Sequence, residues 1–241
     1  MIQYRFVDCG YSLDRVEAGR ETYLQEHVPG AAFVGIDELS DLSVKGEGRH
    51  PLPTAEAFAA AATRAGIGPG VFVVAYDHGG AGGAARLWWL LRHFGHEDVA
   101  VLGGGFESWL GPVRGGEEEI EPREFVPRPR EGDTIDAKEL AARLGEPGLA
   151  VVDARVPERY RGEVEPIDPV AGRIPGAVNW PYGTEIPARL ADADEVVVYC
   201  GSGITACVDL LALAQAGRPD AKLYPGSWSD WSARGLPSET G

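Results

Sequence analysis

The stretch VVVYCGSGIT, residues 196–205, places a cysteine between an apolar run and a turn of glycine and serine. The apolar and aromatic residues before Cys200 are typical of a buried parallel strand. A helical pattern follows from about Thr205. The strand therefore delivers the thiol to the carboxyl edge of a sheet, where open α/β sheets bind ligands, and to the N-terminus of a helix.

The loop after Cys200 is suited to holding negative charge. Glycine permits positive φ angles and a close approach of the backbone, so that successive N–H groups form a concave anion site. The same donors and the helix dipole favour the thiolate form of the cysteine. The sequence predicts that Cys200 is a nucleophile. We expect the loop residues Gly201, Gly203, Ile204 and Thr205 to bind the substrate.

Two halves of the chain repeat the same motifs in the same order. The first half reads RFVDCGYS, HVPGAAFVGI, VFVVAYDHGG and VAVLGGGFESW, and the second reads LAVVDARVP, RIPGAVNWPY, EVVVYCGSGI and AKLYPGSWSDW. Asp77 stands where the second copy has Cys200, so the thiol belongs to the second copy. The Gly-, Pro- and charge-rich stretch between the copies indicates a linker. We predict domains at residues 1–112 and 134–241, joined by a linker at 113–133.

Each copy alternates short apolar runs with helical patterns. Apolar runs without polar alternation suit parallel strands that are covered on both faces. The predicted fold class is α/β, a tandem duplication in which each domain has a parallel sheet flanked by helices. Strands are expected at residues 72–75, 99–102, 150–152 and 196–199, and helices at 55–65, 84–94, 137–144 and 205–216.

Composition and charge narrow the classes of partner. A net charge of −15 argues against a nucleic-acid-binding protein, which would carry a basic face. The sequence shows no basic and apolar leader, and no apolar run approaches the ~18 residues of a membrane span. The three cysteines share no CxxC spacing, which predicts neither a zinc site nor a disulfide framework. We expect a cytoplasmic protein, monomeric in the simplest case, that binds neither nucleic acid nor membranes.

The motifs YCGSGITA, VVDAR, RYRGE, RIPGAVNWP and YPGSWSDW resemble those of two-domain rhodanese-type sulfurtransferases. The resemblance covers nearly the whole chain and implies a catalytically silent first domain and a catalytic second domain. It implies a ping-pong cycle in which Cys200 takes a sulfane sulfur from thiosulfate or 3-mercaptopyruvate, forms a persulfide, and passes the sulfur on. The expected partners are a small anionic sulfur donor and a thiol or cyanide acceptor. No metal or organic cofactor is implied.

Two other classes of function remain open at this point. Cysteine phosphatases use a similar loop but carry an arginine after five intervening residues, and that position is Ala206 here. Without the arginine a phosphate dianion loses a bidentate, charge-assisted partner. The second alternative is a non-catalytic sulfur carrier or regulatory module, because silent rhodanese copies occur in the family.

The donor stays open between thiosulfate and 3-mercaptopyruvate. A loop that begins CGSG resembles the mercaptopyruvate branch, in which two arginines hold the donor carboxylate. Arg159 of PERYRGE matches the first arginine. The second belongs to an EPR triplet, where this chain has Ile167 and Asp168 instead. Arg173 stands where the family has a histidine, and is either a substitute in the anion site or a surface arginine.

The resemblance to the mercaptopyruvate enzymes also implies a Ser-His-Asp relay beside the cysteine. Ser202 matches the serine, and His50 of GRHPLP with Asp37 of GIDELSD match the other two. The relay would then use side chains from the silent first copy. The alternative is that His50 only buttresses the seam between the domains.

Overall fold

The computed structural model describes residues 3–12, 15–79, 82–190 and 192–241. The chain divides into two compact units, one made of Met1–Asp41 with Leu52–Arg130 and the other of Leu42–Pro51 with Glu131–Gly241. Ten residues from the first half of the sequence therefore belong to the second unit. These ten residues include His50, which becomes important at the site.

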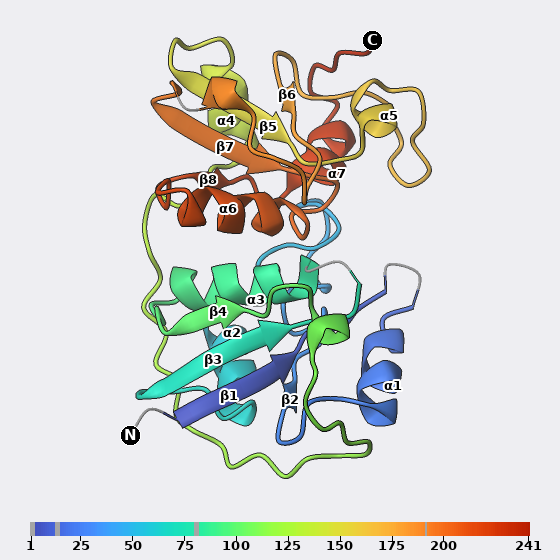
Figure 1. Ribbon diagram of the computed structural model, residues 1–241. Helices are drawn as coiled ribbons and strands as arrows, with labels where there is room; N and C mark the ends of the chain where they lie inside the picture. The colour runs from blue at the N-terminus through green and yellow to red at the C-terminus, as the bar shows by residue number, and fades with distance from the viewer. Residues whose placement is uncertain (1–2, 13–14, 80–81, 191) are drawn as a thin grey trace. The chain divides into compact units, whose positions relative to one another are not determined.

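The first unit is built on a four-stranded parallel sheet with the strand order β2-β1-β3-β4 (Figure 1). The strands are β1 (Gln3–Asp8), β2 (Ala32–Phe33), β3 (Val71–Tyr76) and β4 (Val99–Val101), and the helices are α1 (Ala18–Gln25), α2 (Ala55–Arg64), α3 (Gly82–His93) and the short 3-10 helix η1 (Phe106–Ser108).

The second unit repeats the same arrangement, with the strand order β6-β5-β7-β8 and every pair parallel. Its strands are β5 (Leu149–Asp153), β6 (Val178–Asn179), β7 (Glu195–Tyr199) and β8 (Lys222–Leu223), and its helices are α4 (Ala137–Arg143), α5 (Pro157–Tyr160), the 3-10 helix η2 (Ala188–Leu190), α6 (Ala206–Gln215) and α7 (Ser227–Ala233). The predicted fold class, a duplicated α/β domain with parallel sheets, is confirmed.

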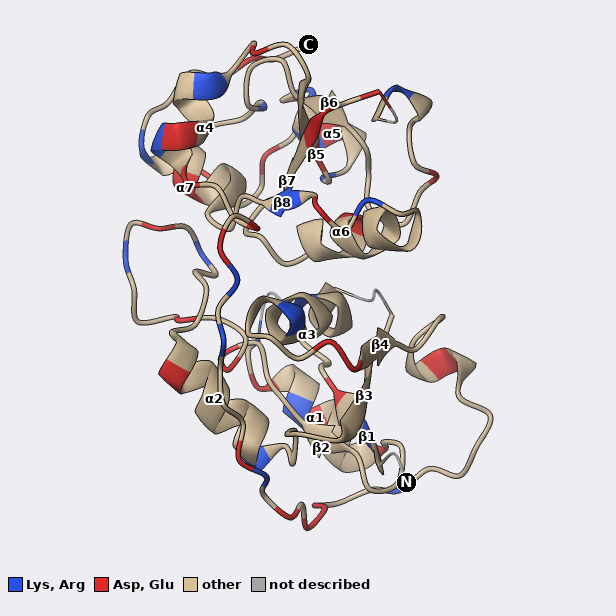
Figure 2. Cartoon of the chain, turned by 90° about the vertical axis from the view of Figure 1, so that its left-hand side faces the viewer, with Lys and Arg blue, Asp and Glu red and all other residues tan. Residues whose placement is uncertain are grey.

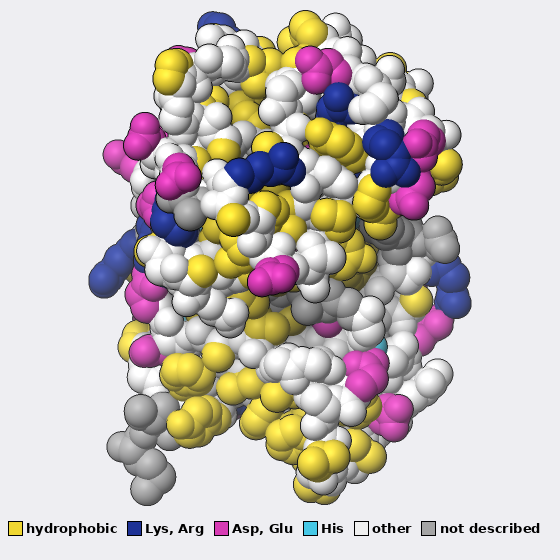
Figure 3. All heavy atoms as spheres, turned by 45° about the horizontal axis from the view of Figure 1, so that its top comes forward, with side chains coloured by type: hydrophobic (Ala, Val, Ile, Leu, Met, Phe, Trp, Pro, Cys, Tyr) yellow, Lys and Arg dark blue, Asp and Glu magenta, His cyan; other side chains and the backbone are white. Residues whose placement is uncertain are grey.

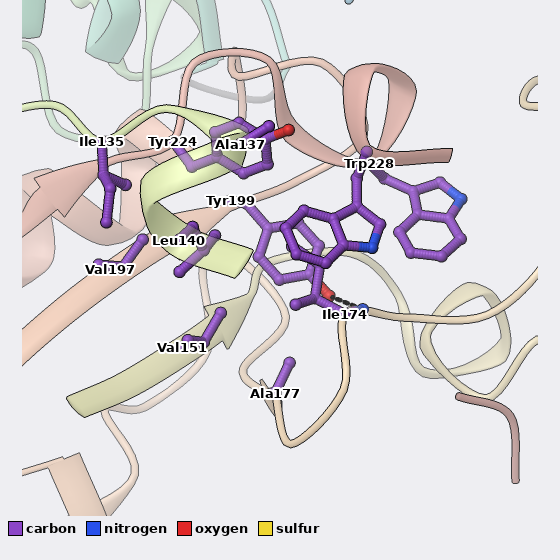
Figure 4. Packing of buried hydrophobic residues seen from close by; sticks show 11 residues of the cluster. Ile135, Ala137, Leu140, Val151, Ile174, Ala177, Val197, Tyr199, Tyr224 and Trp228 are labelled. Atoms are coloured by element: carbon purple, nitrogen blue, oxygen red, sulfur yellow. Dashed lines mark hydrogen bonds between the residues drawn. The ribbon is translucent and has the colours of Figure 1, made fainter. Parts of the chain in front are cut away.

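The core of the second unit lies between its sheet and the helices α4 and α7. Val151 and Val197 of the strands pack there with Leu140 of α4 and Trp228 of α7 (Figure 4). Figure 1 shows α6 on the opposite side of this sheet. Strands covered on both faces must be apolar throughout, which explains why β7 reads EVVVY without polar alternation.

A buried tyrosine ties the end of β7 to its neighbours. Its hydroxyl donates a hydrogen bond of 2.7 Å to the Asp153 carboxylate, and it accepts one of 3.1 Å from the Ile174 N–H (Figure 4). Asp153 in turn accepts hydrogen bonds from the Arg155 guanidinium. Tyr199, immediately before Cys200, is thereby fixed in both its backbone and its side chain.

The stretch predicted as a linker, residues 113–133, contains no helix or strand, and all of it lies within the described part of the chain. Its first part is bonded along the first unit, with the N–H groups of Arg114, Arg123 and Arg128 donating to backbone carbonyls there. The chain enters the second unit again at Glu131, and Thr134 forms a bridge with Leu223 of β8. The first part of this stretch is therefore held by its backbone, and its role as a linker between domains stays a prediction.

The charged groups are distributed over both units. In the second unit α4 carries both signs, whereas α6 carries no Lys or Arg and one acidic residue, Asp209 (Figure 2). On the face drawn in Figure 3, basic side chains are separated by acidic, apolar and uncharged ones. Among the described helices, none has both the length and the apolarity that a membrane crossing requires.

Candidate active site

Cys200 follows β7 directly and is 2% exposed. The backbone N–H of Gly203 donates a hydrogen bond to its sulfur, with an N–S distance of 3.1 Å. This geometry requires Gly203 to adopt a φ of 82°, in the left-handed region that glycine tolerates. A Cβ at this position would also lie 2.4 Å from the Pro225 carbonyl oxygen. The predicted loop thus aims a backbone donor at the thiol.

The segment around the start of α7 holds the cysteine loop from the other side. The Ser227 hydroxyl accepts a hydrogen bond from the Cys200 N–H, and the N–H groups of Trp228 and Ser229 donate to the carbonyls of Cys200 and Gly201. Ser227 has a φ of 54°, the one positive value at a non-glycine residue in the described chain. Such a conformation costs about 1 to 3 kcal/mol, and here it places the hydroxyl under the Cys200 backbone.

The helix after the loop begins one residue later than expected. Thr205 is the residue before α6, has helical backbone angles and makes no side-chain cap. Ile204 is buried, and its carbonyl accepts from the Cys207 N–H. Ala206, at the position that holds arginine in cysteine phosphatases, is the first residue of α6 and is fully buried. No guanidinium can extend from that position toward the loop.

All three cysteines are free thiols, and their surroundings differ. Burial and the carboxylate of Asp8 raise the pKa of Cys9 well above its ordinary value, which keeps that thiol protonated. The Cys207 sulfur donates to the Gly203 carbonyl at 3.5 Å. Cys200 instead accepts from a backbone N–H. The contact between the Gly203 N–H and the Cys200 sulfur is the arrangement that the sequence predicts for a nucleophile, and this role of Cys200 stays a prediction.

A buried acid lies on α6, behind the loop. Neither carboxylate oxygen of Asp209 has a hydrogen-bond partner in the described structure. Burial, followed by the charges of Cys200 and Asp153, raises the pKa of Asp209 to about 9. The side chain is therefore neutral at pH 7 and adds no negative charge behind a thiolate. The sequence analysis did not predict this buried acid, although a single acid within the apolar segment ACVDLLALAQ could have indicated it.

Arg159 reaches the cysteine loop from α5. Its guanidinium donates to Glu165 at 2.6 Å and to Asp168 at 3.1 Å, and a Cβ on Gly201 would lie 3.3 Å from its Nη1. The structure therefore brings the predicted arginine beside the residue that follows the cysteine. It also shows that two carboxylates already occupy this guanidinium.

A second arginine at the loop was not predicted. Arg49 forms an ion pair with Asp168, and its Nη2 would lie 2.9 Å from a Cβ on Gly201. Its backbone N–H donates to the Ser229 hydroxyl at 3.1 Å. Gly48 before it has a φ of 93° and packs against the Gly226 carbonyl. These contacts hold the segment Leu42–Pro51 on the start of α7.

Arg173 lies elsewhere in the second unit. Its guanidinium donates to the Gly241 carbonyl at 2.7 Å and stacks over the Tyr160 ring. Its backbone pairs with Glu239 in an isolated bridge. The side chain is thus engaged with the C-terminal residues, and these contacts are those of a structural arginine. Its proposed role in the anion site stays a prediction.

Two of the three relay residues are in contact. The Nδ1 atom of His50 lies 2.8 Å from the Ser202 hydroxyl oxygen. His50 is part of Leu42–Pro51 and so belongs to the same compact unit as the serine. Asp37 belongs to the first unit, and its carboxylate lies over Gly35, where a Cβ would be 2.4 Å away. Its place in a relay stays a prediction.

The fold and the loop together define a class: a duplicated α/β protein with a cysteine in a glycine-rich loop at the carboxyl edge of its second sheet. The family described as the rhodanese-like domain matches residues 3–111 and 136–234. The chain belongs to the rhodanese family, with two copies of its domain.

Similar proteins match most of the chain. It is 42% identical to a probable 3-mercaptopyruvate sulfurtransferase of Pseudomonas aeruginosa, over 93% of this chain and 88% of that one. It is 41% identical to a putative thiosulfate sulfurtransferase of Mycobacterium tuberculosis, over 94% and 87%. The crystal structure of SseA from Escherichia coli, described as a 3-mercaptopyruvate sulfotransferase, superposes with a TM-score of 0.79 at 33% identity, over 94% and 93%. The predicted class of enzyme, a sulfurtransferase, is confirmed.

Proposed function

We propose that the protein transfers a sulfane sulfur from a small anionic donor to a thiophilic acceptor through a persulfide on Cys200. The observation that carries this proposal is the hydrogen bond from the Gly203 N–H to the Cys200 sulfur. The same donor that stabilises a thiolate can stabilise the terminal sulfur of a persulfide, which is also an anion. The described contacts of the other two thiols differ, since the sulfurs of Cys9 and Cys207 each lie against a backbone carbonyl oxygen.

The proposed chemistry balances for either donor. With thiosulfate, the Cys200 thiolate attacks the outer sulfur, the sulfur–sulfur bond breaks, and sulfite leaves with the electron pair. With 3-mercaptopyruvate, the thiolate attacks the donor sulfur and the carbon–sulfur bond breaks. The pair on carbon then takes the thiol proton to give pyruvate. Attack by cyanide on the persulfide returns the thiolate and releases thiocyanate.

The pair formed by His50 and Ser202 has a place in the second of these reactions. 3-Mercaptopyruvate carries a thiol proton that must leave sulfur and reach carbon, whereas thiosulfate carries none. A serine hydroxyl two residues after the nucleophile, hydrogen-bonded to an imidazole at 2.8 Å, can accept and return such a proton. The pair therefore supports 3-mercaptopyruvate as a donor, while the anion-binding loop itself accommodates either donor.

The test is a comparison of donors with matched cysteine variants. We expect thiocyanate formation by the wild-type protein with at least one of the two donors, and none with Cys200→Ser. Cys207→Ser is the control, because its hydroxyl can keep the hydrogen bond to the Gly203 carbonyl, and it should remain active. An inactive wild-type protein would favour the carrier or regulatory module. Hydrolysis of a phosphate ester by the wild-type protein, lost in Cys200→Ser, would favour the phosphatase.

We also propose that the enzyme works in the cytoplasm. Its three free thiols, including the one that carries the chemistry, are suited to a reducing compartment. The proposed partners are small molecules, an anionic donor and a thiol or cyanide acceptor.

A further inference from the structure

One carboxylate of the chain lies between two arginines at the cysteine loop. Asp168 forms ion pairs with Arg49 through one carboxylate oxygen and with Arg159 through the other, the latter at 3.1 Å. Its side chain is 4% exposed. The arrangement is that of a carboxylate bound by two guanidiniums, with the carboxylate supplied by the protein.

The two guanidiniums lie beside Gly201, in the loop that carries the cysteine. A Cβ on Gly201 would lie 2.9 Å from an Arg49 nitrogen and 3.3 Å from an Arg159 nitrogen. Gly201 is the residue directly after Cys200. A side chain there would displace the end of the Arg49 side chain, so the glycine leaves room for both guanidiniums beside the backbone of the loop.

The carboxylate of Asp168 is less firmly held than that of its neighbour Glu165. Glu165 accepts from the guanidiniums of Arg155 and Arg159, and also from the backbone N–H groups of residues 167 and 168. These bonds fix the turn at residues 165–168 and orient the guanidinium of Arg159. Among the hydrogen bonds of the described residues, those of the Asp168 carboxylate go to the side chains of Arg49 and Arg159, so the carboxylate can leave the arginines without breaking the turn.

The charges around the loop cancel while Asp168 is in place. The polar cluster contains three arginines and three acids, so it offers an incoming anion no net positive charge. Once Asp168 leaves, Arg49 and Arg159 share one vacant position for a carboxylate. The cluster consists of Arg49, Arg155, Arg159, Asp153, Glu165 and Asp168.

We propose that Asp168 is an internal carboxylate that occupies the anion seat between Arg49 and Arg159, and that the carboxylate of the sulfur donor binds by displacing it. This inference rests on the proposed function of the Cys200 loop. In this arrangement Arg49 supplies the second guanidinium, because the chain has Ile167 and Asp168 where the second arginine was expected. It also makes Asp168 a specificity residue, because a ligand with a carboxylate can reproduce its two ion pairs.

While Asp168 occupies the position between the two arginines, the donor carboxylate cannot bind there. The apparent affinity for the donor is therefore the intrinsic affinity multiplied by the fraction of molecules in which this position is vacant. Asp168→Asn removes the charge and keeps the side-chain volume, so the two arginines become available. The probe is pyruvate, which has the carboxylate of 3-mercaptopyruvate and no sulfur to transfer. Titration calorimetry of pyruvate into the Cys200→Ser protein measures binding without turnover.

We expect Asp168→Asn to tighten pyruvate binding by about ten-fold. The matched control is Glu163→Gln, which removes one negative charge from the same segment, where Glu163 is exposed and pairs with Arg161. It should leave binding unchanged. Arg49→Gln should weaken binding by about ten-fold, and in that background the gain from Asp168→Asn should shrink.

Two results would overturn the inference. One is pyruvate binding by Asp168→Asn that is no tighter than by Glu163→Gln, with thermal unfolding showing that both are folded. The other is unchanged binding by Arg49→Gln, a test that does not depend on the folding of an Asp168 variant. Because pyruvate binding needs no sulfur chemistry, failure of the transfer assay with intact pyruvate binding would reject the proposed function alone.

Discussion

The imidazole of His50 and the hydroxyl of Ser202 lie 2.8 Å apart although 151 residues separate them in the chain. The contact forms because the segment Leu42–Pro51 packs with the second compact unit. The contact places an imidazole beside the Cys200 loop, within hydrogen-bond distance of the hydroxyl of a serine that is itself part of this loop.

If this pair moves the thiol proton of the donor, both side chains take part in the same proton transfer and neither is effective without the other. We expect His50→Gln and Ser202→Ala each to lower kcat/KM for 3-mercaptopyruvate by about 10²-fold, and the double variant to be little worse than either one. Thiosulfate carries no thiol proton, so its kcat/KM should change much less. Additive losses, or equal losses with both donors, would contradict a shared role in proton transfer.

The loop glycine at 203 should be much more sensitive to substitution than another glycine with a similar backbone. Both Gly203 and Gly217 have φ above 80°, but only at Gly203 would a Cβ approach a carbonyl oxygen, that of Pro225, at 2.4 Å. We expect Gly217→Ala to lower the free energy of unfolding by about 1 kcal/mol and Gly203→Ala by about 3 kcal/mol. Denaturant titrations measure both, and equal losses would show that the loop is not arranged as described.

Asp209 should make the stability depend on pH. Its pKa of about 9 in the folded protein lies above its ordinary value, so the folded state keeps a proton that the unfolded state releases. The free energy of unfolding should therefore fall as pH rises from about 4 to about 9, by up to about 1.4 kcal/mol per unit. The neutral variant Asp209→Asn should lose this slope. Denaturant titrations at pH 6 and pH 8 would show it, and parallel pH profiles would mean that Asp209 is ionised in the fold.

The hydroxyl of Ser227 should support both stability and activity. Its loss leaves the buried Cys200 N–H without its acceptor, which costs about 1 to 3 kcal/mol. Ser232→Ala on the same helix is the control, because it removes a buried hydroxyl that bonds only within α7. We expect Ser227→Ala to reduce sulfur transfer more than Ser232→Ala does. Equal activity of the two variants would separate the start of α7 from the reactivity of Cys200.

Local patterns were sufficient to predict the elements that position the nucleophile. The strand expected at 196–199 is Glu195–Tyr199, and the helix expected at 205–216 is Ala206–Gln215. Apolar runs and helical periodicity are properties of neighbouring residues, and the internal repeat supplied the order of the elements. The repeat also showed that Cys200 stands where the first copy has Asp77.

The side chains around the loop depend on contacts that no local pattern encodes. Arg49 was missed because its position beside Gly201 follows from the packing of Gly48 and of its own N–H on the start of α7. Arg173 was considered for the anion site from its place in a motif, yet its guanidinium bonds to the last residue of the chain. Asp168 was noted as the replacement of a missing arginine, and its ion pairs became visible only in the folded unit.

In the proposed mechanism, Cys200 carries the transferred sulfur. The most direct measurement is the mass of the cysteine-containing peptides after incubation of the wild-type protein with donor and digestion without reductant. We expect a gain of one sulfur atom on the peptide that contains Cys200, reversed by cyanide with release of thiocyanate. A sulfur on the peptide of Cys9, or a gain that persists in Cys200→Ser, would contradict it.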